Sequence, residues 1–385
     1  MPEKKLTEVP PRSTSAFLLR CAREPDRFYY PCNAKARDPV HCAYEFNVAK
    51  RQRSVSIVVR ECEYVDGGTG WRAWPCALLL ACWLAKHAHE LELDDAAVLE
   101  LGCGLGLPGL TAAALGARRV ALSDCLPRLL RTVAESCAAC AALQQRTEPQ
   151  QTEQEQPSTP EQPPSPAAVA PAADAVLLDW DEEVPCCADS SEQYSTEQGV
   201  KAAQLLREEA EAEAGGGAPP VPRLRPDERF DLLLASDVIY SAGHAAVLPR
   251  VVARRAAAAA AAAAATGSGN SRGAGGARFC GMVPVRCAEH THAFLRGLQQ
   301  QGFTVTLACV SAAWVAAVVA LQGPPAGKQA PPPASATSLP CETRATVPYV
   351  HGDAAGATAL REGDIVFVEA CRGGIRPNGE SVRGS

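Results

Sequence analysis

The chain has 385 residues, an apolar fraction of 47% and a formal net charge of −6 at pH 7. This length allows one large domain or two ordinary ones with a sizeable core, and the acidic balance argues against direct binding of nucleic acid. The 17 cysteines are scattered, the first residues lack the apolar stretch of a signal peptide, and no apolar run is long enough for a membrane span. We therefore expect a cytoplasmic or nuclear protein with reduced thiols and no membrane contact.

The first part of the chain is expected to precede the core of the fold. Residues 1–53 are predicted to form a tail and an extension. A strand follows at residues 54–63, which are rich in β-branched side chains. After a glycine turn at residues 67–70, Trp74 and Pro75 are predicted to open a helix over residues 76–87, because proline is tolerated in the first helical turn.

From residue 96 onward, predicted strands and helices alternate. The strands are expected at residues 97–101, 119–123, 175–178, 230–235, 278–285, 303–309 and 365–370. The helices are expected at residues 107–115, 127–143, 244–265 and 289–300. Such alternation is typical of an α/β fold with a mostly parallel sheet and helices on both faces.

Four segments are predicted to lie outside this core, at about residues 144–171, 187–226, 266–277 and 323–345. They are rich in Gln, Glu, Pro, Ser, Gly or Ala, and such compositions bury too little apolar surface to offset the entropy of ordering the chain. We expect disordered insertions in the loops of one domain that runs over residues 54–370, with a C-terminal tail at 371–385. The alanine run after Arg255 is expected only to lengthen a helix.

A glycine-rich motif is the strongest local signal. Residues 98–109, VLELGCGLGLPG, combine a buried strand, a glycine turn and the start of a helix. Glycine allows a positive φ and a close approach of a ligand to the backbone, and a helix N-terminus attracts negative charge. Gly104, Gly106 and Gly109 fit the dinucleotide pattern G-x-G-x-x-G. The alternative is a tight turn that binds no ligand.

Acidic residues follow the next predicted strands, at the edge where parallel sheets bind ligands. Asp124 lies about twenty residues beyond the glycines, where Rossmann-type folds place an acid on the ribose hydroxyls of NAD or S-adenosylmethionine. Asp179 could accept a hydrogen bond from an adenine amino group, and Trp180 could stack on the ring. Asp124 could instead cap the helix predicted over residues 127–143, and Trp180 could simply pack.

A second group of residues is expected near an acceptor. Asp237 and Tyr240 follow the fourth predicted strand and could hold a cationic acceptor through charge pairing and a cation–π contact. The alternative is an N-cap aspartate with a packed tyrosine. Trp74 could form one wall of a cofactor pocket or pack without contacting a ligand. Cys137 and Cys140 have C-x-x-C spacing, but they lack a second pair, so we interpret them as helix-face residues rather than metal ligands.

Taken together, the motifs resemble the seven-β-strand protein methyltransferases of lysine methyltransferase family 16, the methyltransferase-like group. The resemblance covers roughly residues 55–370 without the insertions. It depends on the Trp-Pro helix start and on VLELGCGLGLPGL, LSD, LDW and LASDVIY, all in family order. Several stretches, including the run that ends at Arg286, are most similar to a member regarded as a histone arginine methyltransferase. Most other members methylate a lysine in a single protein, such as a chaperone or an elongation factor.

The resemblance implies a Rossmann-like class I methyltransferase fold with a seven-stranded sheet and S-adenosyl-L-methionine as cofactor. It also implies roles at the cofactor and at the acceptor. The implied cofactor residues are Trp74 behind the cofactor, Glu100 beneath the loop, Gly102, Gly104 and Gly106 at the methionine moiety, Asp124 at the ribose, and Asp179 and Trp180 at the adenine. The implied catalytic residues are Asp237 and Tyr240, without a metal. The long acidic insertion after Asp179 departs from the family pattern.

These observations predict an enzyme that transfers a methyl group from S-adenosylmethionine to a protein side-chain nitrogen, with lysine favoured. One alternative is a protein arginine methyltransferase that acts on a histone, and another is an inactive methyltransferase fold kept for binding. An NAD-dependent oxidoreductase is a further alternative, but the sequence shows no Lys, His or Tyr-x-x-x-Lys site for hydride transfer. The expected partner is a chaperone, an elongation factor or a histone, and the protein is expected to be a monomer.

Overall fold

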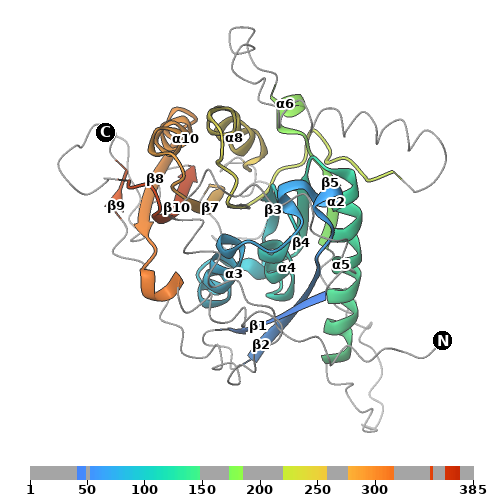
Figure 1. The fold of residues 1–385 in the computed structure, drawn as a ribbon. Coiled ribbons are helices and arrows are strands. Elements are labelled where there is room, and N and C mark those ends of the chain that lie inside the picture. Colours follow the sequence, from blue (N-terminus) through green and yellow to red (C-terminus); the bar gives the residue numbers. More distant parts are fainter. Residues whose placement is uncertain are drawn as a thin grey trace, which may run out of the picture.

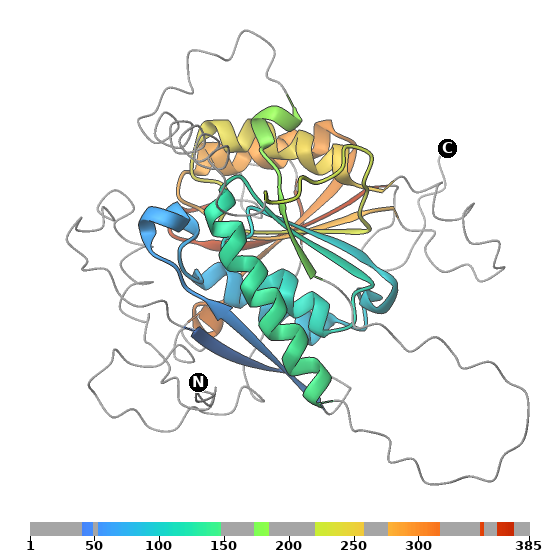
Figure 2. The same ribbon diagram turned by 90° about the vertical axis from the view of Figure 1, so that its right-hand side faces the viewer.

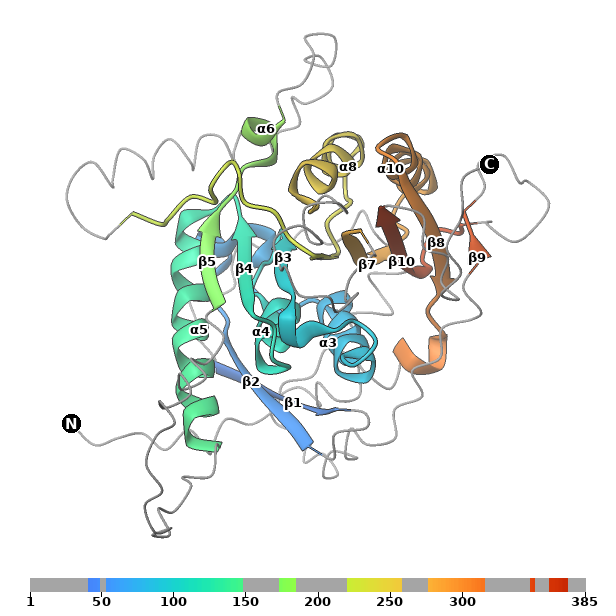
Figure 3. The same cartoon turned by 180° about the vertical axis from the view of Figure 1, so that it is seen from behind.

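The computed structural model describes residues 41–48, 53–147, 173–184, 220–257, 276–315, 347–349 and 360–372. The strands of these segments form a two-stranded sheet and an eight-stranded sheet, the latter in the order β5-β4-β3-β6-β7-β10-β8-β9 (Figure 3). The small sheet consists of β1 (His41–Val48) and β2 (Arg53–Arg60). The large sheet consists of β3 (Ala97–Leu101), β4 (Arg119–Asp124), β5 (Ala173–Leu177), β6 (Leu232–Ser236), β7 (Arg278–Pro284), β8 (Phe303–Cys309), β9 (Val347–Pro348) and β10 (Ile365–Arg372).

The sheet is mostly parallel, as the sequence predicts. Strands β5, β4, β3, β6 and β7 pair in parallel, whereas β10 runs antiparallel to both β7 and β8. The predicted seven strands are all present, and the two-residue strand β9 adds an eighth at the edge. The strand order reverses at β3, which lies between β4 and β6, so the carboxyl ends of these strands border the crevice where such sheets bind ligands.

Helices cover both faces of the sheet (Figures 1 and 2). One face carries α3 (Pro75–His87), α4 (Leu107–Ala114) and α5 (Pro127–Thr147), with β1 and β2 packed outside them. The other face carries α8 (Ala242–Arg255) and α10 (Ala288–Gln300). The shorter elements are α2 (Tyr64–Gly67), η2 (Gly68–Gly70), η3 (Leu93–Asp95) and α6 (Trp180–Glu183). Within the described segments, no helix is long and apolar enough to span a membrane.

Alternating strand residues divide the core into two layers. Val98 and Val120 pack in the layer that includes α3 and α4, whereas Leu99 and Leu233 pack in the layer that includes α8 and α10. This alternation follows from the strand geometry, since successive side chains point to opposite faces. Because both faces are covered, β3 is buried along its whole length, and it carries Glu100 into the interior.

Two sequence predictions are wrong where they reach described residues. The helix predicted over 244–265 ends at Arg255, because Ala256 is extended (φ −70°, ψ 131°) and forms a bridge with Phe230. Residues 220–226, predicted as the end of a disordered insertion, are ordered, with Leu224 buried and donating its N–H to the carbonyl of Leu177 at 3.1 Å. In both places a contact with a distant segment of the chain outweighs the local composition.

Smaller differences concern the other boundaries. Helix α5 continues to Thr147, past the predicted start of the first insertion at 144, and Ala277 is buried at the end of the third. Strand β1 was not predicted and falls within the segment assigned to the N-terminal extension. The remainder of the four insertions lies outside the described residues, as do residues 1–40 and 373–385. The domain limits stay predictions.

Candidate cofactor and acceptor site

The glycine loop between β3 and α4 has the geometry that its sequence predicts. Gly102, Gly104 and Gly106 have φ values of +62°, +52° and +77°, in the left-handed region that favours glycine. A Cβ added to Gly102 would lie 2.9 Å from Cγ1 of Val238 and 3.3 Å from Cζ2 of Trp180. Both the backbone angle and the lack of space therefore require glycine at this position.

A second turn lies against the glycine loop. A Cβ on Gly70 would lie 3.0 Å from the Cα of Gly104, so the two backbones pack closely. The indole N–H of Trp74 donates to the carbonyl of Thr69 at 2.6 Å, and the guanidinium of Arg72 lies over the Trp74 ring, 4.9 Å from its centroid. Trp74 thereby holds the turn that flanks the loop, and its direct contact with a cofactor stays a prediction.

Glu100 supports the loop from beneath. The side chain is fully buried, and Oε2 accepts a hydrogen bond from the N–H of Gly109 at 2.8 Å. Burial is the main cause that raises the pKa of this carboxyl to about 8; the Gly109 hydrogen bond acts in the opposite direction, and the charge of Asp124 adds a smaller upward contribution. Pro108, the second residue of α4, has no N–H. The first turn of α4 therefore lacks two of the donors that a pyrophosphate would use, so the loop suits a ligand without phosphate.

Asp124 ends β4 and joins the loop to the next strand. Its Oδ2 accepts from the N–H of Gly104 at 3.3 Å, and its Oδ1 accepts from Cys125 at 2.8 Å and from Leu126 at 3.3 Å. Burial raises the pKa of Asp124, and these N–H groups act in the opposite direction. The N–H of Leu178 donates to the Asp124 carbonyl at 3.0 Å. The carboxylate is therefore held at the crevice, where a ribose hydroxyl could bind.

Asp179 and Trp180 follow β5 at the same edge. Asp179 caps α6, since its Oδ1 accepts from the N–H of Asp181 at 2.9 Å; the sequence analysis did not predict this cap. The Trp180 ring lies against Gly102 of the glycine loop. The structure brings both residues to the crevice, and their contacts with adenine stay predictions.

Asp237 is engaged by a residue that the sequence analysis did not place in the site. Arg286 contacts both of its oxygens: Nε and Nη2 lie 3.1 and 2.9 Å from Oδ1, and Nη2 lies 2.7 Å from Oδ2. The side chains are 9% and 29% exposed. Asp237 also has a φ of +54°, which is uncommon for a non-glycine residue. Asp237 follows β6, and Arg286 follows β7, the neighbouring strand. The adjacency of these two strands is the signal that could have revealed the pair.

The rings of Trp180, His244 and Tyr240 form an aromatic group in which His244 contacts the other two. The ring of His244 meets the Tyr240 ring edge-on with centroids 4.3 Å apart, and it meets the Trp180 ring at 5.8 Å. Tyr240 is 47% exposed, and its hydroxyl interacts with the side chain of Thr69. Burial lowers the pKa of His244 to about 4, so the ring is neutral at pH 7, and its Nδ1 is buried without a hydrogen-bond partner in the described segments. The sequence analysis missed His244.

The described residues contain no group of three or more His, Cys, Asp or Glu side chains that could hold a metal ion. Cys140 interacts through Sγ with the backbone of Val58 at 3.3 Å, and this contact ties α5 to β2. Burial raises the pKa of Cys137 to about 12, which leaves this thiol protonated and weakly nucleophilic. These two cysteines therefore behave as packed helix residues in the structure.

Known proteins match this part of the chain. Residues 56–176 match the family model described as "Lysine methyltransferase". The "Histone-arginine methyltransferase METTL23" of Xenopus laevis is 38% identical over 101 residues, which are 24% of this chain and 40% of that protein. The protein of the same name from Homo sapiens is 46% identical over 66 residues, 17% of this chain and 33% of that protein. "Protein-lysine methyltransferase METTL21E" of Mus musculus is 44% identical over 57 residues, 15% of this chain and 22% of that protein.

The alignments with these relatives thus span less than half of their length. Among solved structures, the T. Thermophilus 16S rRNA N2 G1207 methyltransferase aligns with a TM-score of 0.36 and 14% identity, over 69% of this chain and 47% of that one. Over residues 56–176, about a third of the chain, this protein is therefore similar to the lysine methyltransferase family.

Proposed function

We propose that this protein is an S-adenosylmethionine-dependent methyltransferase whose acceptor is a side-chain nitrogen of another protein. The start of α4 is the observation that carries the cofactor choice. Pro108 has no N–H and the N–H of Gly109 is bound by Glu100, so a pyrophosphate would lack two of the N–H donors at this helix start. S-adenosylmethionine has no phosphate. Its ribose matches Asp124, and its cationic sulfonium is compatible with the acidic residues at this edge.

When bound, the cofactor would supply a methyl group on a positively charged sulfur. The residues of the chain would then bind and orient. Asp124, already fixed by three N–H groups, would accept from the ribose hydroxyls. The glycine loop would let the methionine moiety approach the backbone, and Trp180 would border the adenine beside Asp179. Positioning of this kind accounts for most of the rate enhancement available to such a transfer.

The acceptor side is formed by Asp237, Arg286, Tyr240 and His244. We favour lysine as the acceptor, in line with the description of the matching family model. A lysine must lose a proton before it attacks, and a site lined by neutral rings lowers the pKa of an amine by desolvation. The neutral His244 ring beside Tyr240 fits this requirement.

Arginine is the second candidate. The matches to histone-arginine methyltransferases favour the same acceptor. The acceptor protein would be a histone in this case, and a chaperone or elongation factor in the case of lysine.

The experiment is incubation with radiolabelled S-adenosylmethionine and a protein extract, followed by mass-spectrometric mapping of the labelled residue. We expect label on lysine, and label on arginine would establish the second candidate. Asp124→Ala serves as the control and should transfer less label. If the wild type binds S-adenosylhomocysteine but transfers no label, the protein is an inactive methyltransferase fold that acts by binding.

A further inference from the structure

A buried ion pair behind the cofactor crevice has no role in the proposed reaction so far. We infer that Glu183 and Arg255 are positioning residues that hold the α6 turn, and with it Trp180, in place for the cofactor. The inference deepens the proposed function and rests on it. Neither residue touches the reacting groups, so both would act through Trp180.

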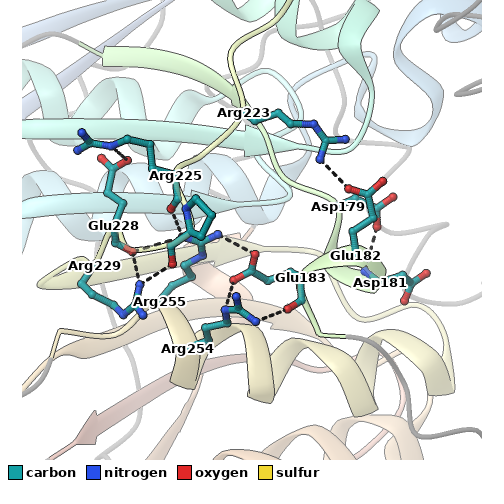
Figure 4. A network of polar contacts seen from close by, with 11 residues as sticks. Asp179, Asp181, Glu182, Glu183, Arg223, Arg225, Glu228, Arg229, Arg254 and Arg255 are labelled. Carbon is teal, nitrogen blue, oxygen red and sulfur yellow. Dashed lines mark hydrogen bonds and ion pairs between the residues drawn. The ribbon is translucent and has the colours of Figure 1, made fainter.

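Figure 4 shows the pair within a network of charged side chains. Nη2 of Arg255 lies 2.7 Å from Oε2 of Glu183, and the two side chains are only 1% and 8% exposed. Arg254 contacts the same glutamate, with Nε 2.9 Å from Oε1 and Nη1 donating to the Glu183 carbonyl at 2.7 Å. Nη1 of Arg255 also donates to the carbonyls of Arg225 at 2.5 Å and Glu228 at 3.3 Å. One guanidinium thus joins α8 to α6 and to the loop before β6.

The α6 turn connects Glu183, which Arg255 binds, to Trp180 beside the glycine loop. It is a single turn over Trp180–Glu183, closed by the N–H of Val184 donating to the Trp180 carbonyl at 3.1 Å. At one end, Trp180 contacts His244 in the first turn of α8 and lies against Gly102. At the other end, Glu183 is bound by the last turn of α8. Helix α8 therefore holds α6 at two points, one at Trp180 and one at Glu183.

Stability alone does not explain such a pair. Removing two charges from water costs about as much as their attraction returns, and apolar side chains of similar volume are often as stable. What apolar side chains would not reproduce is the set of polar contacts that Arg254 and Arg255 make to Glu183 of α6 and that Arg255 makes to the loop carbonyls of Arg225 and Glu228.

The neighbouring residue provides a matched control. Glu182 lies in the same turn and pairs with Arg223 at 2.6 Å, but these side chains are 58% and 62% exposed, and exposed pairs contribute little. By calorimetry with S-adenosylhomocysteine, we expect Glu183→Ala to weaken binding by about tenfold or more, which corresponds to about 1.4 kcal/mol. We expect Glu182→Ala to stay within about twofold of the wild type. Glu183→Gln keeps an oxygen for Arg255, so its affinity should lie between those of Glu183→Ala and Glu182→Ala. If Glu183→Ala does not fold, Glu183→Gln is the deciding variant. An affinity of Glu183→Gln equal to that of the wild type would then overturn the inference.

A double-mutant cycle separates positioning from general stability. If Glu183 acts through Trp180, then Glu183→Ala should weaken binding little further in a Trp180→Ala background. Losses that add fully, or equal binding by Glu183→Ala and Glu182→Ala, would overturn the inference while the proposed function stands. If the wild type does not bind S-adenosylhomocysteine at all, the proposed function fails and the inference fails with it.

Discussion

The contact between Asp237 and Arg286 gives a prediction whose size follows from the geometry. The pair makes three N–O contacts of 2.7 to 3.1 Å with side chains 9% and 29% exposed. Removing one partner of a fully buried pair costs about 3–5 kcal/mol. Because Arg286 is partly exposed and can be hydrated, we expect Asp237→Ala to lower the free energy of unfolding by about 2–3 kcal/mol, near the value of a single charge-assisted hydrogen bond.

The backbone of Asp237 adds a second, separable effect. Its φ of +54° costs a non-glycine residue about 1–2 kcal/mol. Asp237→Gly removes this penalty together with the carboxylate, so it should be more stable than Asp237→Ala by about 1 kcal/mol. Asp237→Asn tolerates the same φ and serves as a variant that removes only the charge.

The assay is urea unfolding of Asp237→Ala, Arg286→Met and the double variant, combined with S-adenosylhomocysteine calorimetry and the methyl-transfer assay. We expect a coupling energy above about 1 kcal/mol between the two residues, nearly unchanged cofactor affinity, and methyl transfer reduced by orders of magnitude. Effects on stability that add within about 0.5 kcal/mol would refute the energetic reasoning. Undiminished methyl transfer by Asp237→Ala would show that the residue has only a structural role.

Two further predictions concern the loop. Asp124→Ala should weaken S-adenosylhomocysteine binding, measured by calorimetry, by about 1.5–3 kcal/mol. Asp124→Asn should weaken binding less, because it keeps an acceptor oxygen for the N–H of Cys125. Unchanged affinity in both variants would show that the carboxylate does not contact the cofactor. Glu100 has a pKa of about 8 in the fold against 4.5 in its ordinary state, so its contribution to stability is complete below pH 4.5 and is lost as pH rises through 8. Relative to Glu100→Gln, urea unfolding of the wild type should lose about 1.36 kcal/mol per pH unit within this window, and parallel pH profiles of the two proteins would contradict this.

Local patterns were sufficient for the centre of the fold. The strands at 97–101 and 303–309 have the predicted bounds, and the glycine loop, Asp124, Trp180 and Tyr240 meet at one edge as expected. The reason is that glycines, a buried β-branched run and a proline at a helix start each constrain the backbone within a few residues. The α/β alternation then determines which strand ends come together.

Contacts between distant segments were not predictable in the same way. The Asp237–Arg286 pair joins residues 49 positions apart, and the Glu183–Arg255 pair joins residues 72 apart. Both depend on which strands and helices become neighbours. The end of α8 shows the same limit, since alanine favours helix but the chain turns at Ala256 to pair with Phe230. Leu224, hidden in a proline- and arginine-rich stretch, is buried for the same reason.

The central claim is that the glycine loop and Asp124 bind S-adenosylmethionine rather than a dinucleotide. Isothermal titration calorimetry of the wild-type chain with S-adenosylhomocysteine and, separately, with NAD tests it most directly. We predict saturable heat with S-adenosylhomocysteine that is reduced in Asp124→Ala, and no measurable heat with NAD. Tight NAD binding without any S-adenosylhomocysteine binding would contradict the account.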